Sequence, residues 1–239
     1  LLNAVYSDDF SGLIDCNNFG FILRTWTLTD IAGNTTVKVQ TIWVEPTPTV
    51  TVVNNTPIIC NNANVNLVIN SLTISINSAN LSYVVTVTST DPAHLGGSAS
   101  TGFTTLKADL PFSITGTLTN SSDAPIVVTY TVTPKLNGCS DGPVQIVTVI
   151  VNPTPQVVPG TLAQTICNDG TTNITLGSPS TFTSGLITFN YTAIATGGVT
   201  GFTTPVTGLP KDHIIADILH NPTDAQQTVT YTIVPISPT

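Results

Sequence analysis

One internal repeat constrains the fold of this chain more than any other feature of its sequence. The segment 46–48 (PTP) recurs as 153–155, and the segment 59–61 (ICN) recurs as 166–168. Both pairs are separated by 107 residues (153 − 46 and 166 − 59). Self-similarity at a fixed spacing is the signature of tandem modules, each of which forms one structural unit.

The repeat continues towards the C-terminus, where 128–132 (VTYTV) recurs as 229–233 (VTYTI) at a shift of 101 residues (229 − 128). The shorter shift indicates loops of different length between strands that persist. We therefore predict a complete module over 46–152 and a second module over 153–239 that is truncated before its last strand. Residues 1–45 are expected to be the C-terminal part of a preceding module.

Within a module the apolar residues alternate with polar ones. Tyr83, Val85 and Val87 share one face of a predicted strand, and a later strand carries Val128, Tyr130 and Val132, with Thr between them. Glu45 is the only Glu and charged residues make up 8%, which disfavours helices throughout. The residues 144–151 are apolar on both faces, as expected for a strand packed on both sides or at a module junction. The pattern predicts an all-β chain of tandem immunoglobulin-like β-sandwich modules strung end to end.

Two predicted linkers carry alternating prolines. Pro46 and Pro48 lie in the first linker, and Pro153 and Pro155 lie in the second. Proline fixes its own φ angle and restricts the preceding residue to extended conformations. We expect short, semi-rigid connections, so that the partners of each module are its neighbours in the same chain.

Charge and hydropathy exclude several classes of partner. The net charge is −8 with five Lys and Arg, so the chain lacks the cationic surface that nucleic acid or anionic lipid requires. No apolar run approaches the roughly 18 residues of a membrane span, so membrane insertion is not expected. Four Cys without close pairs suit an oxidising, extracellular environment. The chain opens on Leu1-Leu2-Asn3 without a signal peptide, which indicates an internal fragment of a longer protein.

Two stretches resemble known repeats. The segments 128–134 (VTYTVTP), 137–139 (NGC) and 152–155 (NPTP) resemble the PKD-like repeats of giant Bacteroidota surface proteins. The segment 24–35 (RTWTLTDIAGNT) is similar to the HYR-type, immunoglobulin-like repeats of the same proteins. The resemblance implies type IX secretion and an adhesive filament on the bacterial cell surface, as in gliding-motility adhesins of the SprB type.

The cysteines are the sharpest candidate for covalent chemistry. Cys60 lies near the start of the complete module and Cys139 just before its last strand, so a disulfide between them is expected to staple the sandwich. Cys167 repeats the position of Cys60, and both Cys167 and Cys16 are expected to pair with cysteines outside the fragment. The alternative interpretation is four free, buried thiols.

Other side chains offer little catalytic or metal chemistry. Asp212, His213 and His220 lie in a predicted surface loop without a nucleophile motif, so we expect no enzyme activity. Calcium needs several converging oxygens, and Asp residues such as Asp8 and Asp123 are not clustered. We therefore expect no cofactor and do not expect calcium.

The two tryptophans bear on carbohydrate binding. Trp26 alternates with Ile22 and Leu28 and is expected in the core. Trp43 lies close to the first linker, where it either packs at the module junction or stands exposed as a ligand-binding aromatic. The leading hypothesis is a non-enzymatic stalk or adhesin segment. The alternatives are a carbohydrate-binding module and an accessory region of a secreted hydrolase.

Overall fold

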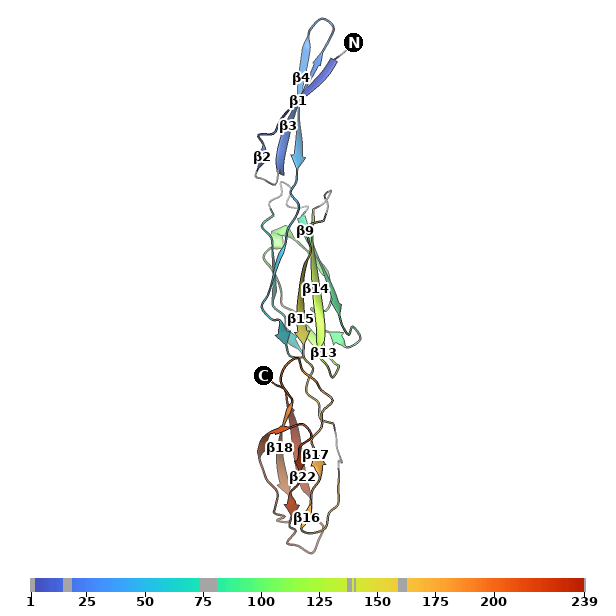
Figure 1. Cartoon of the computed structure of the whole chain (residues 1–239), viewed down its shortest axis with the longest axis vertical. Helices are drawn as coiled ribbons and strands as arrows, with labels where there is room; N and C mark the ends of the chain where they lie inside the picture. The colour runs from blue at the N-terminus through green and yellow to red at the C-terminus, as the bar shows by residue number, and fades with distance from the viewer. Residues whose placement is uncertain are drawn as a thin grey trace.

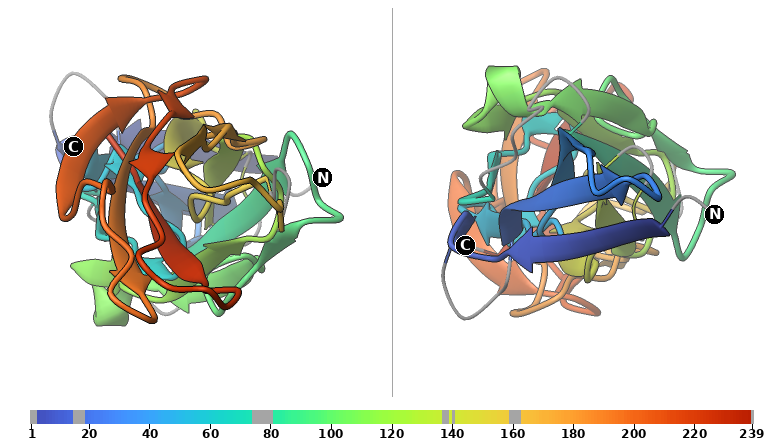
Figure 2. Two further views of the ribbon diagram at one scale, coloured as in Figure 1. Left: turned by 90° about the horizontal axis from the view of Figure 1, so that it is seen from below. Right: turned by 90° about the horizontal axis from the view of Figure 1, so that it is seen from above.

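The protein is a column of three β modules, seen in a computed structural model that describes residues 3–14, 19–73, 81–136, 139, 141–158 and 163–238. The modules follow one another along the longest axis (Figure 1) and overlap when viewed down it (Figure 2). In the described part of the chain the only helical segment is the 3₁₀ turn η2 Lys107–Asp109. The predicted all-β architecture of sandwich modules strung end to end is confirmed. Within the same ranges, no helix is long and apolar enough to cross a membrane.

The first module is a single antiparallel sheet. Its central strand β3 pairs with β1 and β2 along one side and with β4 along the other. No second sheet covers either face among the described residues, so Val5, Val37 and Val39 are all more than half exposed. The strands are β1 Asn3–Asp9, β2 Leu13–Ile14, β3 Phe19–Thr29 and β4 Thr35–Val44.

The second module is a β-sandwich. One sheet has the order β11-β9-β14-β15-β6, and two three-stranded sheets, β12-β8-β5 and β10-β13-β7, supply the other layer. Every pairing is antiparallel except that of β15 with β6. The strands are β5 Thr51–Asn54, β6 Ile58–Ile59, β7 Ala63–Asn64, β8 Leu67–Asn70, β9 Leu81–Ser89, β10 Leu95–Gly96, β11 Phe103–Leu106, β12 Phe112–Ile114, β13 Thr117–Asn120, β14 Ile126–Leu136 and β15 Gln145–Val151.

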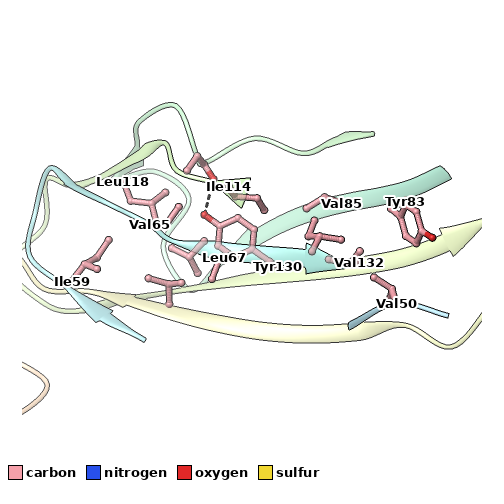
Figure 3. Packing of buried hydrophobic residues seen from close by; sticks show 14 of the residues in the cluster. Val50, Ile59, Val65, Leu67, Tyr83, Val85, Ile114, Leu118, Tyr130 and Val132 are labelled. Atoms are coloured by element: carbon pink, nitrogen blue, oxygen red, sulfur yellow. Dashed lines mark hydrogen bonds between the residues drawn. The ribbon is translucent and has the colours of Figure 1, made fainter. Parts of the chain in front are cut away.

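The core of the second module follows the predicted alternation. The inward side chains of β14, Val128, Tyr130 and Val132, are each 0% exposed. Figure 3 shows Tyr130 and Val132 among the buried side chains of this core. The Tyr130 hydroxyl donates a hydrogen bond of 2.8 Å to the Ala99 carbonyl, so the one polar atom of this side chain is satisfied. Burying a side chain of this size typically stabilises a fold by about 1.5–3 kcal/mol.

The last strand of this sandwich differs from the prediction for residues 144–151. Only one face of β15 is buried: Val149 and Val151 are 0% exposed, whereas Ile146 on the other face is 61% exposed. The strand therefore lies in an outer layer with solvent on one side, although its sequence is apolar at almost every position.

The third module repeats the pairings of the second. β16 pairs with β21 as β7 pairs with β13, β17 with β20 as β8 with β12, and β18 with β22 as β9 with β14. The strands are β16 Gly170–Thr171, β17 Ile174–Thr175, β18 Thr188–Ala195, β19 Val206–Pro210, β20 Ile214–Ile215, β21 Ile218–Leu219 and β22 Val229–Ile236. Its core is smaller and centres on Leu176, Phe189 and Ile215.

Candidate functional site: the module junction

The two linkers begin directly after a strand and lead straight into the next module. β4 ends at Val44 before the first linker, and β15 ends at Val151 before the second. Pro48 and Pro153 are buried, while the other two linker prolines, Pro46 and Pro155, are half-buried. The linkers are therefore packed against the modules along part of their length and are not free tethers.

Buried hydroxyls hold the start of the second module. The backbone N–H of Thr49 donates to Thr73 Oγ1 at 2.8 Å, and Ser71 Oγ donates to the Thr49 carbonyl at 2.6 Å. Ser71 and Thr73 are 4% and 8% exposed. Because burial strengthens hydrogen bonds and penalises unpaired groups, these contacts fix the path of the chain as it leaves the linker.

The third module uses the same arrangement at equivalent positions. The Gln156 N–H donates to Ser180 Oγ at 2.9 Å, and the Ser180 N–H donates to Ser178 Oγ at 3.0 Å. Ser178 and Ser180 are again buried, at 3% and 6% exposure. This pair of buried hydroxyls recurs at the 107-residue shift, with Ser180 in the place of Thr73 (180 − 73). The arrangement is therefore a feature of the repeat and not of one module.

Polar side chains bridge the second and third modules directly. Asn61 Nδ2 donates to Thr154 Oγ1 at 2.7 Å, which ties the second module to the linker. The Asn152 side-chain oxygen accepts hydrogen bonds from Thr183 Oγ1 at 2.8 Å and from the Thr183 N–H at 3.1 Å. These contacts span residues far apart in sequence, and they oppose bending at the linker.

A backbone contact adds to this junction on the same side. The Thr181 N–H donates to the Asp123 carbonyl at 2.8 Å, so a loop of the second module contacts a loop of the third. Asp123 was considered as a possible calcium ligand, but here its carbonyl serves module packing. Within the described ranges no group of three or more His, Cys, Asp or Glu side chains comes together.

A small cleft lies at the same junction. It has a volume of about 110 Å³ and is lined by Cys60, Asn152, Phe182 and Pro238, among others. Pockets that bury a drug-sized ligand usually enclose roughly 300–1,000 Å³. This cleft is better described as imperfect packing between two modules than as a ligand site.

The structure does not form the predicted disulfide between Cys60 and Cys139; both are exposed, free thiols. Cys60 follows β6, whose Ile59 pairs with Val151 at the end of β15. Cys139 lies near the other end of β15. Its N–H donates a hydrogen bond to the carbonyl of Leu136, the last residue of β14. Leu136 lies beyond Val132, which pairs with Gln145 at the start of β15. The seven residues of β15 span roughly 20 Å, and a disulfide joins Cα atoms within about 7 Å.

Strand pairing explains why the two cysteines lie apart. β6 near the start of the module pairs in parallel with β15 at its end. Cys60, which follows β6, therefore lies beside the last residues of β15, whereas Cys139 precedes β15 and lies near its first residues. Cys167 is an exposed free thiol within this chain, and its pairing with a cysteine outside the fragment stays a prediction. The expectation for Cys16 lies outside the described residues.

The aromatic side chains of the first module are exposed. Trp43 is 55% exposed and contacts the Phe21 ring edge-on, with centroids 5.5 Å apart. Trp26 is 38% exposed, which corrects its predicted place in the core, and its Nε1 donates to Gln40 Oε1 at 3.0 Å. The alternation placed it on a shared face, but no second sheet covers that face among the described residues.

A cation lies beside Trp26 on this sheet. The Arg24 guanidinium is 4.2 Å from the centre of the Tyr6 ring and donates two hydrogen bonds of 2.8 Å to Asp8. These hydrogen bonds lower the pKa of the Asp8 carboxyl. The Asp8 carboxylate, a candidate calcium ligand in the sequence, therefore forms an ion pair with Arg24.

The predicted loop around Asp212 and His220 is partly strand. β20 and β21 lie between these residues, and His213 and His220 are exposed. The His220 ring contacts Asp169 Oδ1 at 2.9 Å from its Nδ1 atom, with both side chains more than half exposed. A solvated pair of this kind lacks the desolvated surroundings that acid–base catalysis uses.

The junction residues themselves were missed by sequence reasoning. Asn61 was noted only as part of the repeated segment 59–61, and Asn152 and Thr183 carried no signal of their own in one sequence. The repeat of Asn61 at Asn168 was the available signal, because a polar residue kept at the same place in two modules indicates a shared structural task.

Comparison with known proteins bears on the third module. Residues 164–239 match the PKD-like domain. The predicted resemblance to PKD-like repeats is therefore confirmed for that module. No curated protein is detectably similar to the chain in sequence.

One solved structure aligns with nearly the whole chain. It contains extracellular cadherin domains 1–4 of protocadherin gamma B7, at 12% identity over 99% of this chain and with a TM-score of 0.27. The chain spans 64% of the length of that structure's chain. A TM-score of this size does not establish a common fold.

Proposed function

We propose that the chain is a non-enzymatic structural segment of a long adhesin or stalk filament, exported to the bacterial cell surface. The PKD-like match of the third module and the internal repeat support a structural, adhesion-type repeat. The resemblance to Bacteroidota surface proteins supports adhesion, with gliding motility as its context and type IX secretion as its route of export.

The observation that carries the proposal is the bridged junction between the second and third modules. Asn152 binds Thr183 across the junction and Asn61 binds Thr154, while Pro153 and Pro155 restrict the linker between them. A flexible linker would leave the modules free to reorient, which is the default expectation for a small interface. Direct bridges on a proline linker favour a chain that holds its extension and transmits force.

Small-angle X-ray scattering of the whole chain tests this mechanical role. We expect a maximum dimension that matches three modules in line. The Asn152→Ala variant should lower the average extension, because it removes both hydrogen bonds from Thr183. Asn54→Ala is the matched control, since Asn54 bonds only within the second module, to the Thr148 carbonyl at 2.8 Å. Compact scattering of the unaltered chain, or equal scattering of both variants, would contradict the proposal.

Surface location and the identity of the full protein need separate tests. Antibodies raised against this chain should label intact cells; labelling only after permeabilisation would contradict export. A full-length reading frame with many such repeats and a type IX C-terminal signal is the expected genetic context. A catalytic domain beside a lone pair of modules would instead favour an accessory region of a secreted hydrolase.

The exposed Trp43 favours carbohydrate binding as a second candidate function. Sugars stack on open aromatic faces, and Trp43 is 55% exposed beside Phe21. A glycan array tests this possibility. Binding that is lost in Trp43→Ala and kept in Trp26→Ala would support it, because Trp26 is held by Gln40 and is less exposed. An array without binding to the unaltered chain would contradict it.

A further inference from the structure

One turn of the second module brings together a carboxylate, an imidazole and a proline peptide bond. Residues 91–94 (DPAH) form the turn that follows β9 and leads into β10. The bond between Asp91 and Pro92 is the only Asp-Pro peptide bond in the sequence. His94 Nδ1 lies 2.7 Å from Asp91 Oδ2, so the imidazole N–H donates a hydrogen bond to the carboxylate.

The equivalent turn of the third module shows that the fold does not need these residues. The Thr90 N–H donates to the Val127 carbonyl at 3.0 Å, and the Thr196 N–H donates to the Thr228 carbonyl at 2.9 Å, so both turns begin in the same way. The two hydroxyls accept from the N–H groups of the same partners, at 3.1 and 3.0 Å. After Thr196 the turn continues with residues 197–198 (GG). Because glycine is sufficient in one module, folding does not account for Asp-Pro and His in the other.

The second module holds both ends of this turn in place. Thr90 is bonded to Val127 at the first end. At the other end the His94 carbonyl accepts hydrogen bonds from the Ser121 N–H at 3.1 Å and from Ser121 Oγ at 3.3 Å. The side chains of Asp91 and His94 are 36% and 51% exposed, so water reaches both. The main chain therefore fixes the position of the pair, while the turn stays open to solvent.

The carboxylate of an aspartate can attack the peptide bond that follows it, because it reaches the carbonyl carbon of its own residue. The attack forms a cyclic anhydride and expels the next nitrogen. A proline nitrogen is a favourable leaving group, since it carries no N–H and departs as a secondary amine that takes up a proton readily. A general acid that donates this proton typically accelerates such a step about 10²–10⁴-fold. His94 is placed to supply the proton in this turn.

We propose that the peptide bond between Asp91 and Pro92 is a site of self-cleavage, with Asp91 as the nucleophile and His94 as the general acid. Asp91 Oδ1, the oxygen that His94 does not bind, forms a bond to the Asp91 carbonyl carbon. The C–N bond to Pro92 breaks, its electron pair stays on the proline nitrogen, and the His94 imidazolium gives that nitrogen a proton. Water then opens the anhydride to two carboxylates. Of the two protons released, one returns to the imidazole and the other completes the charged amine of Pro92.

The pair of His220 and Asp169 in the third module lacks one part of this arrangement. Its ring nitrogen and carboxylate oxygen are 2.9 Å apart, but Asp169 is followed by Gly170, whose nitrogen leaves less readily than that of proline. The reaction in the second module needs no desolvated site, because the nucleophile and the bond it attacks belong to one residue. It is a single event within the chain and not turnover of a substrate, so the inference goes beyond the proposed structural function.

Cleavage leaves the module folded but changes its response to force. β9 precedes the cleaved bond, and its two neighbours in the sheet, β11 and β14, follow it. The fragments 1–91 and 92–239 therefore stay joined by strand pairing. An intact module that unfolds under force still tethers the modules on either side, whereas a cleaved module releases them when its sheet opens. The second module thereby becomes the point at which the chain parts under load.

Incubation of the purified whole chain at about pH 6, where histidine side chains exchange their protons readily, tests the reaction. Denaturing electrophoresis and intact-mass spectrometry should show the fragments 1–91 and 92–239 accumulating with time. The fragments should elute together from a sizing column in native buffer and separate in urea. Hydroxylamine, a better nucleophile than water, should be captured as a hydroxamate at Asp91, because it opens the anhydride.

Three variants assign the roles of the side chains. Asp91→Ala removes the nucleophile and should abolish cleavage. His94→Ala should slow cleavage about tenfold or more, and added imidazole should restore part of the rate. His220→Ala is the matched control, because it removes a similarly exposed histidine that also contacts a carboxylate, and it should leave the rate unchanged. Hydrogen exchange of the β9 amides checks that each variant is folded.

Several results would overturn the proposal. They are a chain that stays intact, cleavage at another bond, and an equal rate in Asp91→Ala, which would indicate a contaminating protease. An unchanged rate in His94→Ala would remove the imidazole from the mechanism. A fragment 1–91 without hydroxamate would replace the anhydride with direct hydrolysis. Separation of the fragments in native buffer would contradict the retained strand pairing.

Discussion

Replacing Asn120 with alanine is expected to be among the most damaging single polar substitutions in the second module. The side chain lies between β13 and the end of β15 and makes two donor and two acceptor hydrogen bonds, all between 2.8 and 2.9 Å. Alanine makes none of them. The equivalent replacement of Asn221 provides a matched control in the third module, where three of the four bonds are present.

The hydrogen bonds of each side chain allow the loss of folding free energy to be compared between Asn120→Ala and Asn221→Ala. A hydrogen bond contributes about 1 kcal/mol net, and a polar group left buried without a partner costs about 1–3 kcal/mol. Asn120→Ala removes the side-chain donor to the Val151 carbonyl, where Val151 is 0% exposed and water cannot replace the lost donor. We expect a loss of about 3–5 kcal/mol for this variant. For Asn221→Ala we expect about 1 kcal/mol, because water reaches the half-buried turn and solvates the freed groups.

Native-state hydrogen exchange of the whole chain measures both effects in place. The opening free energy is read at the amides of β14 and β15 for Asn120→Ala, and at those of β22 for Asn221→Ala. Each variant should leave the other module unchanged, since distant sites are additive. The reasoning is refuted if Asn120→Ala costs its own strands no more than Asn221→Ala costs β22.

Three further predictions concern the second module and the thiols. Burial raises the pKa of Tyr130 to about 12, whereas a tyrosine in an unfolded chain has a pKa near 10. The stability that depends on the neutral hydroxyl is therefore complete below pH 10 and is lost as the pH rises to 12. Tyr130→Phe should lower the urea midpoint at pH 7, through the lost bond to Ala99, but should flatten its fall between pH 10 and 12; an equally steep fall would contradict this assignment. The three described cysteines should react with a thiol reagent in the folded chain, and a reductant should leave the Tm of the second module unchanged, whereas a clear drop would restore the predicted disulfide. Gly142→Ala should destabilise β15 by about 1–3 kcal/mol, because the added methyl group would clash with the Pro48 carbonyl oxygen. Gly177→Ala should be nearly neutral in the same hydrogen-exchange measurement, because its methyl group would make only an ordinary van der Waals contact with Val158.

Local patterns in the sequence were sufficient for much of the fold. The alternation of Val128, Tyr130 and Val132 predicted an inward face, and all three are fully buried. Side-chain direction in a strand depends only on period two, so a single sequence contains it. The repeat likewise predicted equivalent strands in two modules, because the same local sequence meets the same partners one module later.

Tertiary structure decided which faces are covered and which ends meet. Trp26 shares a face with apolar neighbours, yet it is exposed because no second sheet covers that face among the described residues. Cys60 and Cys139 bracket a module in sequence but lie at opposite ends of β15, since strand direction is set by long-range pairing. The junction depends on Asn152 and Thr183, whose contact arises only when two modules are placed against each other. The sequence by itself determined the repeated strands and their inward residues, because both depend on local pattern. The packing between distant strands determined which edges are paired, where the thiols lie and how the modules meet.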